Sequence, residues 1–158
     1  MAVFTSKGIQ DTEKFAAQFV GEISKQKKKT CLRASHRQAS ATVVGLSGDL
    51  GSGKTAFVKG VARVLGVKNT VTSPTFVLEK IYNLPPRKGF SKLVHIDAYR
   101  LEHKKELAAL KWNEIIQDPE TLVFIEWPEC VKGALPKDAT RIEFRFIDEH
   151  TREIEIKK

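Results

Sequence analysis

The segment from Gly48 to Thr55 carries the residues best suited to chemistry in this chain of 158 residues. It fits the pattern G-x-x-x-x-G-K-[ST] of a phosphate-binding loop, or P-loop. Glycines let the backbone wrap closely, so that several N–H groups converge on phosphate oxygens. Lys54 would place a cation against the terminal phosphates, and Thr55 would offer its hydroxyl to Mg²⁺. The pattern predicts that a nucleotide is bound by Leu50, Gly51, Ser52, Gly53, Lys54 and Thr55.

Two acidic residues end apolar segments, where a nucleotide site would need them. Glu126 follows Leu122–Ile125, and Asp97 follows Leu93–Ile96. Because the carboxyl ends of parallel strands face the ligand crevice, both carboxylates can reach one Mg²⁺. The alternative, an ordinary acid at the end of a strand, stays open for each. We predict that Thr55, Asp97 and Glu126 hold the metal, and that Lys54, Asp97 and Glu126 serve phosphoryl transfer.

Three further side chains are candidates with open alternatives. The segment Thr72–Thr75 follows the expected P-loop helix, and Ser73 or Thr75 could offer a hydroxyl to Mg²⁺ or the terminal phosphate. A capped turn around proline explains the same residues equally well. Trp127 follows Glu126 and can line the pocket, or it can be a core or interface tryptophan. We expect His95 to pack beneath its strand rather than to act as a base.

The flanking sequence predicts the elements that position these residues. Apolar side chains at helical spacing after residue 12 indicate a first helix. Asp11 or Thr12 can cap its start, because a short side-chain oxygen accepts a hydrogen bond from a free N–H of the first turn. Further helices are expected over residues 54–65 and 102–116, and strands over residues 42–46, 76–82, 93–97 and 121–125. The alternation in 141–146, repeated around Ile154, predicts an antiparallel hairpin with one wet face. Residues 25–41 and 85–89 are predicted to be loops.

These elements predict an α/β fold with three layers, a mainly parallel central sheet and a C-terminal antiparallel hairpin, in one domain over residues 1–158. The net charge of +8 is concentrated in residues 22–40 and 85–92. Such basic loops can contact RNA, although most charge runs are only solvated. No apolar run is long enough to cross a membrane, and the first residues do not indicate a signal peptide. The two cysteines form no CxxC pair, which favours free thiols and a cytoplasmic protein.

Four segments together resemble the TsaE family, small bacterial P-loop ATPases of tRNA threonylcarbamoyladenosine (t6A) synthesis. They are Gly48–Thr55, Thr72–Phe76, His95–Leu101 and Ile125–Glu129. The resemblance implies ATP and Mg²⁺ as ligands and TsaB and TsaD as partners. It implies that ATP hydrolysis regulates the TsaB–TsaD complex, in which TsaD modifies adenosine 37 of tRNA.

The resemblance also implies roles for particular residues. It implies that Thr55 and Glu126 contact Mg²⁺ and that Asp97 supports the metal or a water. Ser73 and Thr75 would belong to a first switch segment and Asp97 to a second. Adenine would be bound near Thr12 and near a turn at Arg152.

The chain departs from the family pattern at three places. The adenine-binding turn lacks the family's glycine before Arg152, Lys111 stands where glycine is common, and the predicted basic loop at 25–41 is longer than usual. That loop could contact tRNA, a partner, or nothing.

The motifs offer no arginine finger, so we expect slow intrinsic ATP hydrolysis that a partner accelerates. A small-molecule kinase on the same fold is the alternative, but residues 127–140 contain no arginine for a substrate lid. A pure RNA-binding module would leave the P-loop unexplained, and the sequence shows no aromatic pattern of an RNA-recognition motif.

Overall fold

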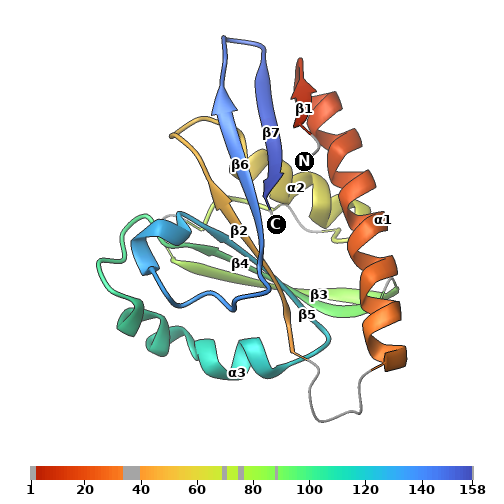
Figure 1. The fold of residues 1–158 in the computed structure, drawn as a ribbon, viewed down its shortest axis with the longest axis vertical. Coiled ribbons are helices and arrows are strands. Elements are labelled where there is room, and N and C mark those ends of the chain that lie inside the picture. The colour runs from red at the N-terminus through yellow and green to blue at the C-terminus, as the bar shows by residue number, and fades with distance from the viewer. Residues whose placement is uncertain (1–2, 34–39, 69–70, 75–76, 88, 158) are drawn as a thin grey trace.

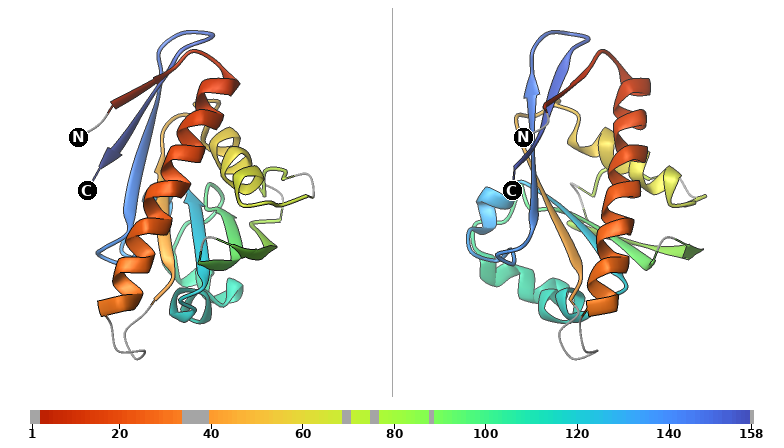
Figure 2. Two further views of the ribbon diagram at one scale, coloured as in Figure 1. Left: turned by 90° about the vertical axis from the view of Figure 1, so that its right-hand side faces the viewer. Right: turned by 45° about the vertical axis from the view of Figure 1, so that its right-hand side comes forward.

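A seven-stranded sheet in the order β1-β7-β6-β2-β5-β4-β3 forms the centre of the computed structural model, which describes residues 3–33, 40–68, 71–74, 77–87 and 89–157. Helices cover both faces (Figures 1 and 2). The strands are β1 (Val3–Ser6), β2 (Thr42–Ser47), β3 (Glu79–Arg87), β4 (Phe90–Asp97), β5 (Thr121–Glu126), β6 (Thr140–Phe146) and β7 (Arg152–Lys157). The helices are α1 (Ile9–Arg33), α2 (Lys54–Val64) and α3 (Trp112–Gln117), with 3₁₀ turns η1 (Lys104–Leu110) and η2 (Pro128–Val131). The predicted three-layer α/β fold is confirmed.

The four central strands β6, β2, β5 and β4 run parallel, and the flanking strands are antiparallel. The apolar runs of β2, β4 and β5 are explained by burial on both faces, as expected for a covered parallel sheet. On β5, all six residues are buried. The strands predicted at residues 42–46, 93–97 and 121–125 are therefore confirmed, each extended at one or both ends.

Helices α1 and α2 pack on one face of the sheet through a cluster of phenylalanines. The ring of Phe57 on α2 lies 5.5 Å from Phe19 of α1, 5.9 Å from Phe124 of β5 and 5.7 Å from Phe144 of β6, measured between centroids. Aromatic pairs at this spacing add to the free energy gained by burial. The cluster therefore fixes α2, whose first residues are Lys54 and Thr55.

The opposite face is covered by η1, α3 and η2. Leu107, Trp112 and Val131 from these elements pack against the alternate residues of β2, β4 and β5. The indole N–H of Trp112 donates to the carbonyl oxygen of Ala134 at 3.2 Å, so this buried polar group is satisfied. This layer supports β5 and β4 from behind.

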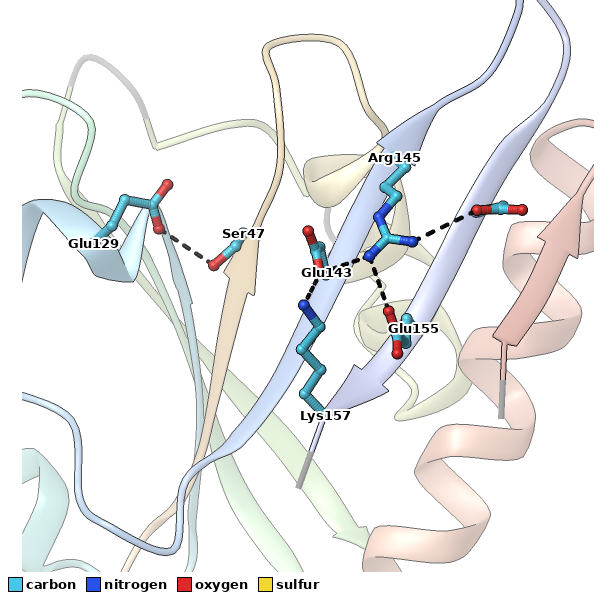
Figure 3. A network of polar contacts seen from close by, with 7 residues as sticks. Ser47, Glu129, Glu143, Arg145, Glu155 and Lys157 are labelled. Carbon is cyan, nitrogen blue, oxygen red and sulfur yellow. Dashed lines mark hydrogen bonds and ion pairs between the residues drawn. The ribbon is translucent and has the colours of Figure 1, made fainter. Parts of the chain in front are cut away.

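The C-terminal hairpin of β6 and β7 has the predicted wet face. Arg145 contacts Glu143 and Glu155, and Lys157 contacts Glu143 (Figure 3). The bond from Lys157, together with Arg145, lowers the pKa of Glu143. Exposed pairs of this kind contribute little stability, about 0.2–1 kcal/mol each. The hairpin is held mainly by its buried face.

Strand β1 was not expected from the sequence. Its four residues pair antiparallel with β7, from Val3 opposite Glu155 to Ser6 opposite Arg152. Four residues are too few to show a clear alternation, and the pairing depends on a strand at the other end of the chain.

In the part of the chain that the structure describes, no helix is long and apolar enough to span a bilayer.

The prediction of a loop over residues 25–41 was wrong for its first half, because α1 continues to Arg33. Lysine and glutamine are good helix formers, so the helix continues through the polar residues 25–28. Lys27 also anchors this part of α1. Its ammonium lies 4.2 Å from the centroid of the Phe90 ring and donates to the carbonyl oxygen of Pro119. Residues 34–39 lie outside the described residues.

The turn predicted at residues 85–89 was also wrong in part, because β3 continues to Arg87. The strand predicted at 76–82 begins later than expected, at Glu79. The pairing register with β4 shifts between Asn83 and Arg87. Proline cannot donate to a sheet ladder, and it is tolerated where a strand has one neighbour or a bulge. Among the strands that the structure describes, β3 pairs with β4 alone, and it has that irregularity.

The helix predicted over residues 102–116 is broken at Lys111. This residue adopts a left-handed conformation, with φ of 54°, and separates η1 from α3. The break lets Leu107 and Trp112 both enter the core on one side of the sheet. Helical spacing alone does not reveal such a break, because both halves are apolar on the same face.

Replacing Lys111 by glycine should stabilise the protein, because glycine adopts a positive φ without the cost that a Cβ incurs. We expect Lys111→Gly to raise the free energy of unfolding by about 0.5–1 kcal/mol. The matched control is Lys105→Gly, within η1, where φ is not positive. That variant should lower the free energy of unfolding by a similar amount. Urea denaturation of the two variants measures the difference, and equal effects would contradict the prediction.

Candidate functional site

The P-loop lies between β2 and α2, and its shape depends on glycine. Gly48, Gly51 and Gly53 have φ angles of 135°, 77° and 103°. A Cβ on Gly48 would lie 2.2 Å from the carbonyl oxygen of Phe144 on β6. The loop therefore packs directly on the backbone of the neighbouring strand. Gly53 precedes the first residue of α2, so the free N–H groups of that helix face the loop.

Lys54 is buried under this loop and is held in place by backbone oxygens. Its ammonium donates to the carbonyl oxygens of Gly48 at 2.6 Å and Asp49 at 2.9 Å. It also lies 4.0 Å from the centroid of the Trp127 ring. Burial lowers the pKa of Lys54, and the negative charges of Glu126 and nearby acids oppose this shift. The cation is thus fixed at the floor of the loop.

Thr55, Glu126 and Asp97 come together next to Lys54. The hydroxyl of Thr55 donates to Oε1 of Glu126 at 2.8 Å. Asp97 lies opposite Glu126 in the parallel register of β4 and β5, and its Oδ1 accepts the backbone N–H of Tyr99 at 3.0 Å. Both carboxylates are almost completely buried. The structure therefore brings together the three oxygen donors that the sequence predicts for a metal.

His95 contacts the same carboxylate, which sequence reasoning missed. Its Nε2 lies 2.8 Å from Oε1 of Glu126, and its side chain is fully buried. The expectation that His95 is buried beneath its strand was correct, but the hydrogen bond to Glu126 was not expected. Alternation places His95 and Asp97 on one face of β4, and the register of β4 with β5 brings Glu126 to that face. The pairing register is the missing information.

The segment after β5 folds back over the end of β2. Trp127 has a φ of 59°, which is unusual for a residue with a large side chain. Its backbone N–H donates to the carbonyl oxygen of Leu46 at 3.1 Å. The hydroxyl of Ser47 donates to Glu129 at 3.2 Å (Figure 3). The Trp127 ring lies 5.1 Å from the ring of Tyr99, between centroids. These contacts hold the indole against Lys54.

A cavity of about 230 Å³ lies between the P-loop and the two carboxylates. Most of the predicted site residues line it: Leu50, Gly51, Gly53, Lys54, Thr55, Ser73, Asp97, Glu126 and Trp127. A more open cavity of about 770 Å³ between η1 and η2 contains none of the predicted site residues. Volume is therefore a poor guide to the chemistry here, and the smaller cavity is the candidate site.

The remaining predicted residues lie elsewhere or are not described. The Ser52 side chain is buried beneath the loop instead of lining the cavity, although its backbone N–H belongs to the loop. Thr12 and Arg152 lie outside the cavity but close to each other. The hydroxyl of Thr12 lies 2.9 Å from that of Ser6, which is opposite Arg152 in the pairing of β1 and β7. Thr75 lies outside the described residues.

The donor set fits Mg²⁺ only in a particular way. Among the residues that the structure describes, no group of three or more His, Cys, Asp and Glu could hold a metal ion. These residues therefore do not form a site in which protein side chains alone surround the ion. Mg²⁺ is usually bound by one or two carboxylates together with substrate phosphates and water. Two carboxylates and a hydroxyl beside a phosphate-binding loop match that arrangement.

Comparison with known proteins identifies relatives over most of the chain. Residues 7–154 match the family model described as "Threonylcarbamoyl adenosine biosynthesis protein TsaE". A protein of that name from Treponema pallidum is 37% identical over 115 residues, covering 73% of this chain and 81% of the relative. A TsaE protein from Borreliella burgdorferi is 40% identical over 93 residues, covering 59% of this chain and 64% of the relative. The match thus spans a little under two thirds of that second relative's length.

The fold also matches a solved structure. A crystal structure of Bacillus subtilis YdiB superposes with a TM-score of 0.68 at 25% identity, covering 97% of this chain and 82% of that one. A TsaE protein from the same species is 37% identical over 112 residues, covering 71% of this chain and 66% of the relative. The similarity therefore extends over the sheet, the helices and the P-loop.

Two glycines of the P-loop provide a matched test of its packing. Gly48→Ala should lower the free energy of unfolding by at least about 2 kcal/mol, because its Cβ would clash with the backbone of β6. A Cβ on Gly51 would meet no atom within 4 Å, so Gly51→Ala should cost only about 1 kcal/mol for its positive φ. Urea denaturation measures both. Equal losses would show that φ alone, and not contact with β6, makes glycine necessary.

Proposed function

The chain belongs to the TsaE family of tRNA threonylcarbamoyladenosine biosynthesis, and we propose that it is a Mg²⁺-dependent ATPase that regulates a TsaB–TsaD complex. The observation that carries this proposal is the joining of Thr55 and Glu126, next to Lys54, in one cavity at the P-loop. Nucleotide, metal and water can all reach such a site. A role in tRNA modification would make the protein cytoplasmic, and a cytoplasmic location is therefore part of the proposal.

The side chains divide the chemical tasks. Lys54 and the N–H groups of Gly51 and Gly53 bind and orient the phosphates. The N–H of Ser52 donates to the carbonyl oxygen of Asp49 at 3.1 Å, and it would join them by exchanging that bond for one to a phosphate. Thr55, Glu126 and Asp97 hold Mg²⁺, which neutralises developing phosphate charge when it is bound. Ser73 lines the same cavity, and its hydroxyl would be a further ligand of the metal or the terminal phosphate. Phosphoryl transfer to water requires this positioning and charge, and no covalent intermediate with the protein.

Hydrolysis by the isolated protein should be slow. Among the described residues that line the cavity, none is an arginine that could stabilise charge in the transition state. A partner would supply or order the missing group, and ATP turnover would then depend on the complex. The same absence weighs against a small-molecule kinase, which would also need a place for its acceptor.

Adenine is the base that the proposal assigns to the site near Thr12 and Arg152. These residues lie together through Ser6, at the start of α1 and β7. The guanidinium of Arg152 lies 4.3 Å from the centroid of the Phe146 ring, which gives a flat surface suited to a base. Replacing Arg152 would then weaken nucleotide binding without affecting the P-loop.

The first test measures ATP hydrolysis with Mg²⁺, for the protein alone and with the TsaB–TsaD complex. We expect the isolated protein to turn over well below the range of about 1–100 s⁻¹ typical of kinases, and the complex to stimulate it. Lys54→Ala should abolish both activities, whereas the exposed Lys59→Ala on the same helix should change neither. An ATP hydrolysis rate that is unchanged by the TsaB–TsaD complex would contradict the regulatory role. Phosphorylation of a small hydroxy compound would support the kinase alternative.

Direct contact with tRNA is an additional proposal that rests on the exposed lysines of α1. Lys25 and Lys28 are exposed, whereas Lys27 is used to hold the helix against Phe90. Lys25→Ala combined with Lys28→Ala should weaken tRNA binding and flatten its salt dependence by about one to two units of slope. Lys59→Ala with Lys68→Ala is the matched control for net charge. An unchanged slope in the first pair would exclude this contact.

A further inference from the structure

We infer that His95 is a positioning residue that fixes the orientation of the Glu126 carboxylate. The inference rests on the proposed function, in which Glu126 helps to hold Mg²⁺. It assigns a role to a buried histidine that takes no part in the binding or hydrolysis steps described above.

The contact follows from the pairing of two strands, β4 and β5. His95 lies opposite Phe124, and Asp97 lies opposite Glu126, in the parallel register of β4 and β5. His95, Asp97 and Glu126 therefore share the face of the sheet that α2 covers, and His95 is the diagonal neighbour of Glu126. The side chain of His95 is 0% exposed, so core packing fixes its ring. Its Nε2 is 2.8 Å from Oε1 of Glu126.

The chemistry of the partners decides which nitrogen carries the proton. A carboxylate only accepts hydrogen bonds, and Oε1 of Glu126 already accepts one from Thr55. His95 must therefore donate from Nε2. Its Nδ1 has no partner among the described residues. A buried N–H needs an acceptor, and the carboxylate of Glu126 supplies one for the hydrogen that the geometry assigns to Nε2.

Two bonds from different elements thus end on one oxygen of Glu126. Thr55 is half-buried and lines the cavity, and its hydroxyl is itself a predicted metal ligand. His95 is locked in the core, so its bond is the one that does not depend on what occupies the cavity. Partners of this kind behind a metal ligand commonly change metal affinity 10- to 100-fold when they are removed.

The test compares His95→Leu with His95→Gln in binding of a non-hydrolysable ATP analogue. Leucine fills a similar volume without a donor, whereas the glutamine amide can still donate to Glu126. We expect His95→Leu to lose roughly 10- to 100-fold of the affinity that Mg²⁺ adds, with little change in EDTA. His95→Gln should restore most of that affinity. Equal Mg²⁺ dependence in His95→Leu and the unchanged protein would overturn the inference.

Two further measurements separate positioning from simple loss of stability. Ile96→Val lies on the same strand but on the other face, so it should lower stability without changing the Mg²⁺ dependence. Nitrogen NMR of the unmodified protein should show hydrogen on Nε2 of His95, and an Nε2 without hydrogen would overturn the inference even if the variants did not fold. If the unmodified protein bound no Mg²⁺-nucleotide, the proposed function itself would fail, a result distinct from both.

Discussion

Parallel pairing of β2, β5 and β4 is the constraint on which the candidate site depends. It brings the carboxyl ends of three strands to one edge of the sheet, where β2 leads into the P-loop and β5 and β4 end in Glu126 and Asp97. The phenylalanines of the core then hold α2 so that its first turn meets Glu126. Without that register, the same residues would be scattered along the chain.

Much of this arrangement could be predicted because its signals are local. The P-loop pattern, the apolar strands and the carboxylates that follow them are all readable within a few residues. The contact of His95 with Glu126 could not be predicted in this way, because it depends on the register between two strands. Strand β1 was missed for a similar reason, since its partner is at the far end of the sequence.

The errors in element boundaries have separate physical causes. Residues 25–28 of α1 are all polar, so apolar periodicity stops there, while helix propensity and the contacts of Lys27 continue the helix. The break at Lys111 is a single left-handed residue between two apolar segments. In both places, apolar periodicity indicates burial accurately and backbone conformation poorly. Most of the predicted site residues line one cavity, whereas the predicted limits of the elements that carry them needed correction.

The two outer strands have a consequence for the protein in concentrated solution. An unpaired strand edge can recruit a strand from another molecule and begin aggregation. Strand β1 offers only four residues for such pairing, and β3 contains Pro85 and Pro86, which have no N–H to donate. Neither edge is a good template, so the sheet can carry exposed apolar residues such as Val3 and Ile81 without propagating from one molecule to the next.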